Sequence, residues 1–218
     1  MSAKPKFAVV LSGCGVYDGS EVHEAVLTLL AIDRQGGSYQ CFAPDVDQYH
    51  VINHVVGSPG AETRNVLVES ARIARGAILP LSQYKASDFD ALVFPGGFGA
   101  AKNLCTFAVD GPNCSVNPDA EAAITSTAAA KKPIVALCIS PVLVAKVLGD
   151  VEVTIGNDTA TAEALTAMGA THTERTHGET CIDEAHKVIT SPCYMLNATV
   201  GQIADGADAA IAAAVRMM

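Results

Sequence analysis

Short, largely apolar runs alternate with amphipathic stretches along most of this 218-residue chain. Four of these runs end at turn residues and are typical of buried strands, at positions 7–11, 39–43, 91–94 and 134–137. Apolar residues at helical spacing predict helices over 20–35, 118–130 and 142–148. This alternation of strand and helix predicts an α/β fold with a doubly wound, mostly parallel sheet.

The segment 44–87 departs from the alternation and is too long for a plain loop. It contains a strand-like run at 51–56 and a helical pattern over 61–75, so we expect an elaboration carried on the sheet. The last third predicts a strand at 151–155, a helix over 159–168, strands near 180–182 and 188–190, and an alanine-rich helix over 198–218. No interdomain linker is evident, and residues 1–218 are expected to form one domain.

Hydropathy and charge exclude several classes of function. No apolar run approaches the length of about 20 residues that a membrane-spanning helix needs. A net charge of −9 without a basic cluster argues against nucleic acids and anionic membranes as partners. Residues 1–7 carry two lysines and lack the apolar core of a secretory signal. We therefore expect a cytoplasmic protein that binds neither nucleic acid nor membranes.

The seven cysteines form an odd set, with no CxxC pair and no ligand-like spacing to the six histidines. Neither a disulfide framework nor a metal site is expected from this pattern. Most of these cysteines are expected to be inert packing residues. Local context therefore has to separate a reactive thiol from the others.

One cysteine stands at the end of an apolar run. The stretch PIVALCISP, residues 133–141, predicts a strand, a sharp turn and a helix, with Cys138 at the bend. A nucleophile at such a bend projects from the carboxyl edge of the sheet, and the amide groups that begin the next helix favour a thiolate. This pattern predicts a lowered pKa for Cys138. The alternative is a small buried core residue.

Other residues that follow predicted strands carry polar chemistry. Gly96 and Gly97 allow a tight turn whose N–H groups can bind an oxyanion, although an ordinary turn has the same sequence. Glu24 lies among apolar residues early in the first predicted helix, where it can carry protons for Cys138 or simply complement the helix dipole. Asn157 and Asp158 follow a predicted strand and, together with Gly96, are candidates for lining a pocket.

Seven segments spread over the chain carry a resemblance to a known family: SGCGVYDGSEVHEAVLTLLAIDR, VINHV, TRNVLVESARIARG, PGGFGAAKNL, ALCISP, TIGND and VITSPCYML. In these segments the chain resembles the ElbB glyoxalases, in the ThiJ/PfpI branch of the class I glutamine amidotransferase-like superfamily. The resemblance implies a flavodoxin-like three-layer sandwich with a nucleophile elbow, and a homodimer. It also implies conversion of a small dicarbonyl compound, glyoxal, to glycolate without a cofactor or metal, with action on other dicarbonyl or glycated compounds as a broader alternative.

The same resemblance implies roles for individual residues. Cys138 corresponds to the nucleophile, Glu24 to a carboxyl group that touches the thiol, and the backbone N–H groups of Gly97 and Ile139 to the oxyanion hole. Hydrolytic members of the superfamily have a histidine directly after the nucleophile, whereas Ile139 stands there in this chain. This departure argues against a peptidase or amidase triad.

Two functions of different classes follow from these residues. In the first, the Cys138 thiolate adds to an aldehyde of glyoxal, Glu24 moves a proton between the two carbons, and water releases glycolate. In the second, the protein is a non-catalytic redox sensor or regulator in which Cys138 is oxidised. A glutaminase-like subunit is a third reading, and the absent histidine argues against it.

Overall fold

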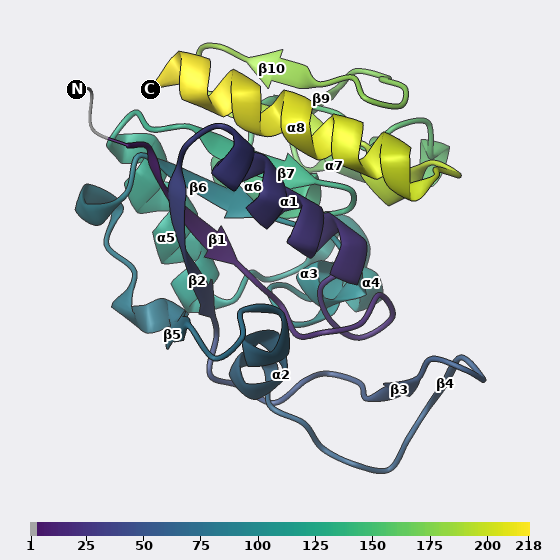
Figure 1. Ribbon diagram of the computed structural model, residues 1–218. Coiled ribbons are helices and arrows are strands. Elements are labelled where there is room, and N and C mark those ends of the chain that lie inside the picture. Colours follow the sequence, from purple (N-terminus) through teal and green to yellow (C-terminus); the bar gives the residue numbers. More distant parts are fainter. Residues whose placement is uncertain (1–3) are drawn as a thin grey trace.

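The computed structural model describes residues 4–218, so the first three residues of the stretch 1–7 lie outside the described part. Its central sheet is built from strands β1 (Lys6–Val10), β2 (Ser38–Ala43), β5 (Ile78–Pro80), β6 (Ala91–Phe94), β7 (Ile134–Leu137), β10 (Cys181–Asp183) and β11 (Val188–Ser191). Their order in space is β10-β11-β7-β6-β1-β2-β5 (Figure 1). All neighbours are parallel except β10 and β11 at one edge. The predicted doubly wound, mostly parallel sheet is confirmed.

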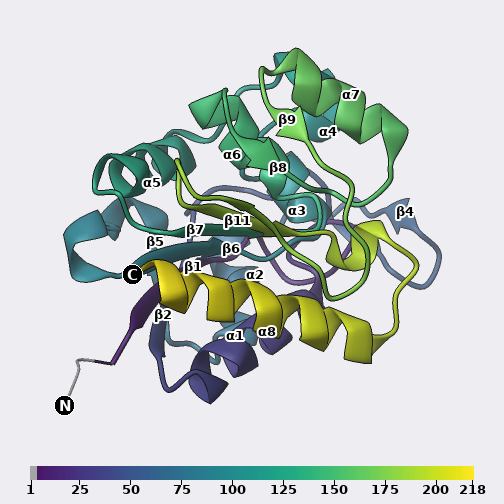
Figure 2. The same ribbon diagram turned by 90° about the horizontal axis from the view of Figure 1, so that it is seen from above.

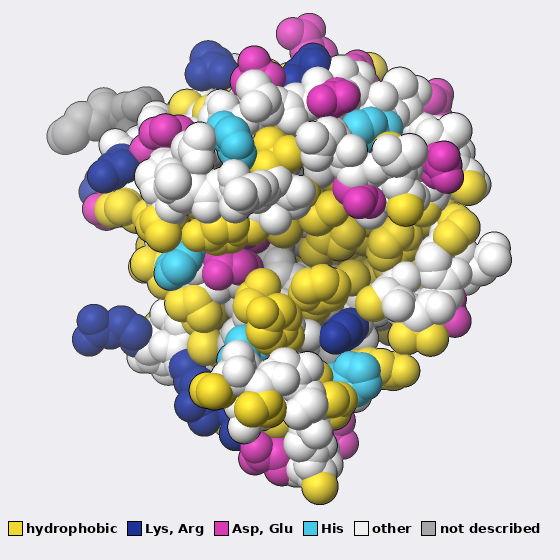
Figure 3. Space-filling view, turned by 90° about the vertical axis from the view of Figure 1, so that its right-hand side faces the viewer, with side chains coloured by type: hydrophobic (Ala, Val, Ile, Leu, Met, Phe, Trp, Pro, Cys, Tyr) yellow, Lys and Arg dark blue, Asp and Glu magenta, His cyan; other side chains and the backbone are white. Residues whose placement is uncertain are grey.

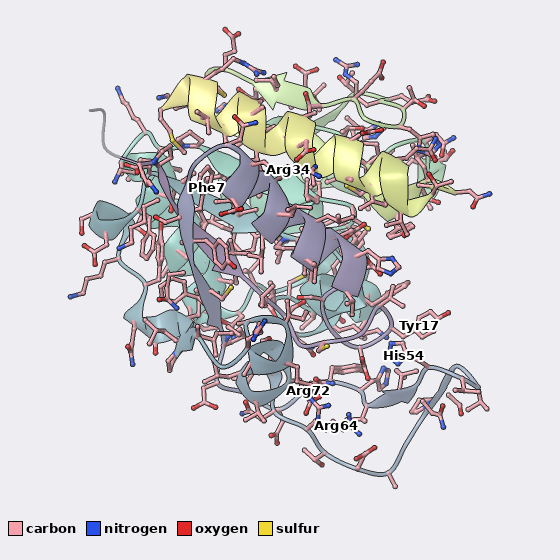
Figure 4. The ribbon with its side chains drawn as sticks, viewed as in Figure 1. Phe7, Tyr17, Arg34, His54, Arg64 and Arg72 are labelled. Atoms are coloured by element: carbon pink, nitrogen blue, oxygen red, sulfur yellow. The ribbon has the colours of Figure 1, made fainter. Side chains whose placement is uncertain are left out.

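Helices cover both faces of this sheet and complete the three layers. Helices α1 (Val22–Arg34) and α8 (Val200–Met217) lie on one face, and α5 (Pro118–Ala129) and α6 (Pro141–Leu148) lie on the other (Figure 2). Arg34 near the end of α1 forms an ion pair of 2.8 Å with Asp208 of α8 (Figure 4). The two helices of this face are therefore joined by charge as well as by packing.

The strand β1 shows why the central runs are apolar throughout. Successive side chains of a strand point to opposite faces of the sheet. Phe7 and Val9 pack with the residues of α1 and α8, whereas Ala8 and Val10 pack with those of α5 and α6. All four are buried because both faces are covered by helices.

The elaboration between β2 and β5 differs from its prediction. The expected strand at 51–56 is wrong, because only β3 (Ile52–Asn53) pairs, with β4 (Ser58–Pro59), in an arm that projects from the body (Figure 1). The carbonyl of Asn53 accepts from Gly57 N at 2.8 Å, and this turn ends β3 after its two residues and reverses the chain. The following helix, α2 (Val66–Ile73), is shorter than the predicted 61–75, because Asn65 caps its start by accepting from Val68 N at 3.0 Å.

The predicted strand at 151–155 does not join the central sheet. Only β8 (Glu152–Val153) forms, and it pairs with β9 (Thr171–His172) in a separate two-stranded sheet. Next to β8, the Thr154 N–H donates to the side chain of Thr190 in β11, at 2.9 Å from Oγ1, and not to a backbone carbonyl of that strand. The helix α7 (Thr159–Ala167) follows, close to its predicted position.

Several short elements carry no sequence prediction. They are β5, α3 (Phe98–Lys102), α4 (Phe107–Asp110), and the 3-10 helices η1 (Leu81–Gln83), η2 (Ala86–Asp88), η3 (Gly111–Asn113) and η4 (Cys193–Met195). None of the helices in residues 4–218 is both long and apolar enough to span a membrane.

Candidate active site

The carboxyl ends of four adjacent strands meet at one edge of the central sheet. These are the ends of β1, β6, β7 and β11, on either side of the point where the strand order reverses. Ligands in open α/β sheets bind at such a point. The chain segments that leave these four ends carry Glu24, Gly97, Cys138 and Tyr194.

The elbow after β7 has the sharp turn that the sequence predicts. Cys138 adopts a left-handed backbone conformation with φ of 59°, which is uncommon for a residue with a side chain. Its N–H donates to Ser191 O at 2.9 Å, and the Ser140 hydroxyl donates to Pro95 O at 2.8 Å. These bonds fix the turn to the ends of β11 and β6, so that the surrounding sheet holds the strained residue in place.

Two glycines after β6 make room for the thiol. A Cβ atom at Gly96 would overlap Cys138 Cβ and Glu24 Oε2, and would lie 3.0 Å from Cys138 Sγ. Gly97 has φ of 102°, and a Cβ there would overlap the backbone of residues 19–21. The Gly97 N–H donates to the Cys138 sulfur. The close approach of Cys138 and Glu24 therefore requires glycine at position 96, and the close approach of residues 19–21 requires it at position 97.

Glu24 lies in the first turn of α1 and is completely buried. Its Oε1 accepts from Tyr194 N at 3.0 Å. Its Oε2 has no well-formed hydrogen bond to a nitrogen or oxygen within residues 4–218 and lies against the Cys138 thiol. Burial raises the pKa of Glu24 to about 8, with a further rise from the neighbouring carboxylate of Glu21. Glu24 is therefore protonated at neutral pH.

The pKa of Cys138 is raised, so the lowered value predicted from the start of the following helix is wrong. The thiol is buried, and burial penalises the charged thiolate. The negative charge that Glu24 carries when ionised raises the pKa further, and the hydrogen bond from Gly97 N–H lowers it by a smaller amount. The first residue of α6 is Pro141, three positions after Cys138. The rise in the pKa of Cys138 from desolvation is therefore larger than the fall that the amide groups at the start of this helix can cause.

A pocket of about 450 Å³ opens in front of Cys138. It is lined by Val16, Glu21, Gly97, Phe98, Ala101, Phe107, Ala108, Cys138, Ile139, Asp158, Thr161, Tyr194 and Met195. Of the residues proposed for the pocket from sequence, Asp158 lines it and Asn157 does not, while Gly96 lies beneath the thiol. Within residues 4–218 the N–H of Ile139 donates to no protein acceptor, so it is free to bind an oxygen atom in the pocket.

The loop after β1 forms one wall of this pocket through Val16. The projecting arm holds that loop, because Tyr17 N donates to His54 Nε2 at 3.2 Å and the two rings lie 4.9 Å apart (Figure 4). Ile52 N of the arm also donates to Asp18 Oδ2 at 2.6 Å. The elaboration between β2 and β5 thus supports the site from outside.

Sequence reasoning missed Tyr194 and Cys193, which follow directly after β11. Tyr194 binds Glu24 through its backbone and donates to or accepts from His23 Nδ1 through its hydroxyl at 2.9 Å. The buried thiol of Cys193 lies against the Cys138 backbone, at a residue with φ of 45°. The rule that singled out Cys138, a polar residue just after a buried strand, would have found Cys193. Tyr194 contacts Glu24 through its backbone N–H, which its residue type does not reveal.

Residues 4–218 contain no group of three or more histidine, cysteine, aspartate or glutamate side chains placed to hold a metal ion. The expectation that the protein acts without metal or cofactor stays a prediction.

Two curated relatives cover most of the chain. The mitochondrial ES1 protein homolog of Rattus norvegicus is 49% identical over 218 residues, which is 95% of this chain and 82% of the relative. The mitochondrial glutamine amidotransferase-like class 1 domain-containing protein 3 of Homo sapiens is 50% identical over 216 residues, which is 94% of this chain and 81% of the relative. No protein-family model matches the chain.

Solved structures share the architecture. An isoprenoid biosynthesis protein with an amidotransferase-like domain from Ehrlichia chaffeensis is 37% identical, with a TM-score of 0.92 over 98% of this chain and 99% of that protein. Glyoxalase III from Candida albicans is 15% identical, with a TM-score of 0.63 over 96% of this chain and 97% of that protein. At that identity the second likeness shows a common fold.

The cytoplasmic location expected from sequence is wrong, because both curated relatives are named as mitochondrial proteins. The expectation rested on the lack of a secretory signal in residues 1–7, and organelle import uses signals of different chemistry. Sequence identity of 49–50% over most of this chain and of each relative shows the family. This chain belongs to the family of ES1 proteins, which carry a glutamine amidotransferase-like class 1 domain.

Proposed function

We propose that this protein is a cofactor-independent glyoxalase that converts glyoxal to glycolate through a covalent bond to Cys138. The observation that carries the proposal is the buried pair of Cys138 and Glu24, a nucleophile in contact with a carboxyl group whose pKa is raised to about 8. General acid and base catalysis is most effective when the pKa of the group lies near the working pH. Glu24 meets that condition.

The reaction starts when Cys138 Sγ bonds to one aldehyde carbon of glyoxal and the thiol proton passes to the Glu24 carboxylate. The oxygen of the resulting hemithioacetal accepts from the N–H groups of Gly97 and Ile139, which stabilise its developing negative charge. Glu24 first passes this thiol proton to the hemithioacetal oxygen and so becomes a carboxylate again. It then removes the proton on the sulfur-bound carbon and returns it to the other carbon, while the hydroxyl proton of the first carbon moves to the oxygen of the second. This transfer oxidises the first carbon to a thioester and reduces the second to an alcohol.

Water then attacks the thioester carbon, the bond from carbon to sulfur breaks, and Cys138 regains its proton as glycolate leaves. The sum is one glyoxal and one water giving glycolate and a proton, with no external oxidant or reductant. Cys138 and Glu24 both end in their starting states, as a catalyst requires.

Glycolate formation from glyoxal by purified wild type and Cys138→Ala tests this function. The wild type should release glycolate, and Cys138→Ala should fall to the uncatalysed rate because no covalent adduct can form. The matched control is Cys41→Ala, which removes another buried thiol, in β2, and should keep its activity. Equal glycolate formation by wild type and Cys138→Ala would exclude the proposal.

A second candidate function is redox sensing, and the buried Cys193 thiol beside Cys138 favours it. Peroxide would oxidise Cys138 to a sulfenic acid, and Cys193 would displace water from it to form a disulfide. Mass spectrometry of peroxide-treated protein can detect this bond. A 138–193 disulfide in a protein that turns over no dicarbonyl compound would favour the sensor over the glyoxalase.

A further inference from the structure

The pocket in front of Cys138 is much larger than glyoxal. Its volume of about 450 Å³ corresponds to roughly fifteen water molecules at about 30 Å³ each. Glyoxal is two linked aldehyde groups, and bound at Cys138 it leaves most of this space to water. A substrate that fills the pocket therefore has a substantial body attached to its reacting aldehyde.

The walls away from Cys138 are apolar. Phe98 and Phe107 stand at the starts of two short helices, and Val16 and Met195 complete the wall. Figure 3 shows hydrophobic side chains gathered across the middle of the right-hand face of the molecule, with charged side chains above and below them. Aromatic side chains in a wall favour a flat, apolar group, because ring pairs add to the gain from buried area.

The charge of the lining is acidic. Glu21 and Asp158 are the charged side chains among the lining residues, and no lysine or arginine lines the pocket in the described part of the chain. The pKa of Asp158 is lowered by its hydrogen bonds to Thr161, so this group is a carboxylate at neutral pH. Lys102 does not line the pocket, although its Nζ lies 5.2 Å from the centre of the Phe98 ring. A substrate with its own carboxylate or phosphate would therefore meet two carboxyl groups in the lining, with Lys102 beside Phe98 as a partial offset.

Size, apolar walls and acidic charge point to one class of substrate. We propose, resting on the glyoxalase function, that the natural substrate is a neutral aldehyde with a second carbonyl beside it and an apolar, preferably aromatic, body. The aldehyde reaches Cys138 and the N–H groups of Gly97 and Ile139, and the body lies between Phe98 and Phe107. Glyoxal is then a minimal substrate that uses only the reacting end of the pocket.

The first test compares kcat/KM for phenylglyoxal, glyoxal and the anion 4-carboxyphenylglyoxal, with the rate of Cys138→Ala subtracted as background. Because burying an aromatic ring is worth about 1.5–3 kcal/mol, phenylglyoxal should exceed glyoxal by about 10- to 100-fold. The anion 4-carboxyphenylglyoxal, which keeps both reacting carbonyls, should have a lower kcat/KM than phenylglyoxal. Equal or better kcat/KM for glyoxal in an active enzyme would overturn the substrate class and leave the glyoxalase function standing.

Variants of Phe98 link this preference to the pocket. Phe98 is 48% exposed, so its truncation should not unfold the protein. Phe98→Ala should lower kcat/KM for phenylglyoxal about 5- to 10-fold and change that for glyoxal less than about twofold, since only the ring contact is lost. Tyr39→Ala, which removes an exposed ring from the far end of β2, is the matched control. Equal losses for both substrates would contradict the inference.

A second, independent test changes the charge of the pocket lining. Asp158→Asn keeps an oxygen that can accept from Thr161 N at the start of α7, now 2.8 Å from Asp158 Oδ1. It should raise kcat/KM for 4-carboxyphenylglyoxal relative to phenylglyoxal about 3- to 10-fold, because one repelling charge is gone. An unchanged ratio would show that the acidic lining does not select against anions.

A binding measurement separates this inference from the proposed reaction. Acetophenone cannot transfer a hydrogen from an aldehyde carbon, so its binding, followed by ligand-observed NMR, does not depend on turnover. Wild type should bind it more tightly than acetone or benzoate, and Phe98→Ala should weaken it. If no dicarbonyl is turned over but acetophenone binds in this way, the reaction fails and the ligand class stands. If acetophenone binds no better than acetone, the ligand class is wrong.

Discussion

Glu24 and Cys138 share one buried space in which two negative charges cannot be held at moderate pH. Glu24 Oε2 and the Cys138 thiol face each other, and no lysine or arginine lines the pocket in front of them in the described part of the chain. Desolvation and mutual repulsion therefore favour the protonated form of each group. The active form of the pair has lost one proton, and the two groups titrate as a unit.

Glu24→Gln should separate proton transfer from simple packing. The amide oxygen can still accept from Tyr194 N, whereas the amide nitrogen cannot accept and return a proton. Glycolate formation should fall by about 10²- to 10⁴-fold, with a thermal midpoint close to that of wild type below pH 5, where Glu24 is protonated. Near-wild-type turnover in a folded Glu24→Gln protein would exclude the proton-carrying role.

The rate should rise with pH through the pKa of Glu24. Below about pH 8 the carboxyl group is protonated, and it can take the thiol proton only as a carboxylate. The value of kcat/KM for glyoxal should therefore increase about tenfold per pH unit below 8 and flatten above it. Hydroxide also converts glyoxal, so Cys138→Ala supplies the background at each pH. A rate that does not change between pH 6 and 8 would contradict this assignment.

The sequence identifies part of this site and misses the rest for a physical reason. Cys138, Glu24 and Gly97 each follow a buried strand with a local pattern that the sequence displays. Tyr194 contributes its backbone N–H, which any residue type would supply, so its identity carries no signal. The pKa of Cys138 was predicted with the wrong sign because burial depends on the tertiary packing of Glu24, Gly96 and Cys193 around the thiol.

At the scale of elements, the turn between β6 and α3 is packed so closely against its neighbours that it has no room for a Cβ atom at Gly96 or Gly97. Gly97→Ala should lower turnover by more than about 10²-fold, because a side chain would push the N–H away from the reacting oxygen. Gly76→Ala is the matched control. Its φ is also positive, at 82°, but its Cβ would meet no atom within 4 Å.

Both substitutions should lower the thermal midpoint through backbone strain, since alanine disfavours these conformations by about 1–2 kcal/mol. Only Gly97→Ala should also change the rate of a protein that remains folded. If both variants keep full turnover at a temperature where they are folded, Gly97 is an ordinary turn residue.

The elements that could be predicted are those whose pattern is set by burial on both faces. The strands β1, β6 and β7 and the helices α1, α5 and α8 were located within a few residues, because each carries a continuous apolar run or stripe. The arm at β3 and β4 and the short β8 were not, because their path depends on hydrogen bonds in which a side chain accepts from a backbone N–H. The accepting side chains are those of Asn53, Thr190 and Asp18. Such bonds join residues far apart or reverse the chain locally, and hydrophobic periodicity does not encode them.

For the whole molecule, Glu24 couples stability to pH. Its pKa is about 8 in the folded state against 4.5 for the free group, so the folded state holds this proton more tightly. Its contribution to the free energy of unfolding is complete below about pH 4.5 and is lost as the pH rises through 8. The slope between these values is about 1.4 kcal/mol per pH unit as an upper limit.

Urea unfolding of wild type and Glu24→Gln between pH 5 and 8 measures this coupling. The glutamine variant has no proton to lose, and the other titrating groups are common to both proteins. The difference in unfolding free energy, wild type minus variant, should therefore fall steadily as the pH rises. A constant difference across this range would mean that the pKa of Glu24 is not raised from 4.5 to about 8 by folding.

The hydrogen bond from Tyr194 to Glu24 joins residues 170 positions apart in the sequence. A ribosome adds about 5 to 20 residues each second, so Glu24 emerges roughly 10 to 30 s before its partner has been made. During that interval the first βα unit has neither the elbow of Cys138 nor the cover of α8. The carboxyl group of Glu24 then stays in water with an ordinary acidity. On the proposed function, the nascent chain therefore turns over no substrate until its last segments are translated.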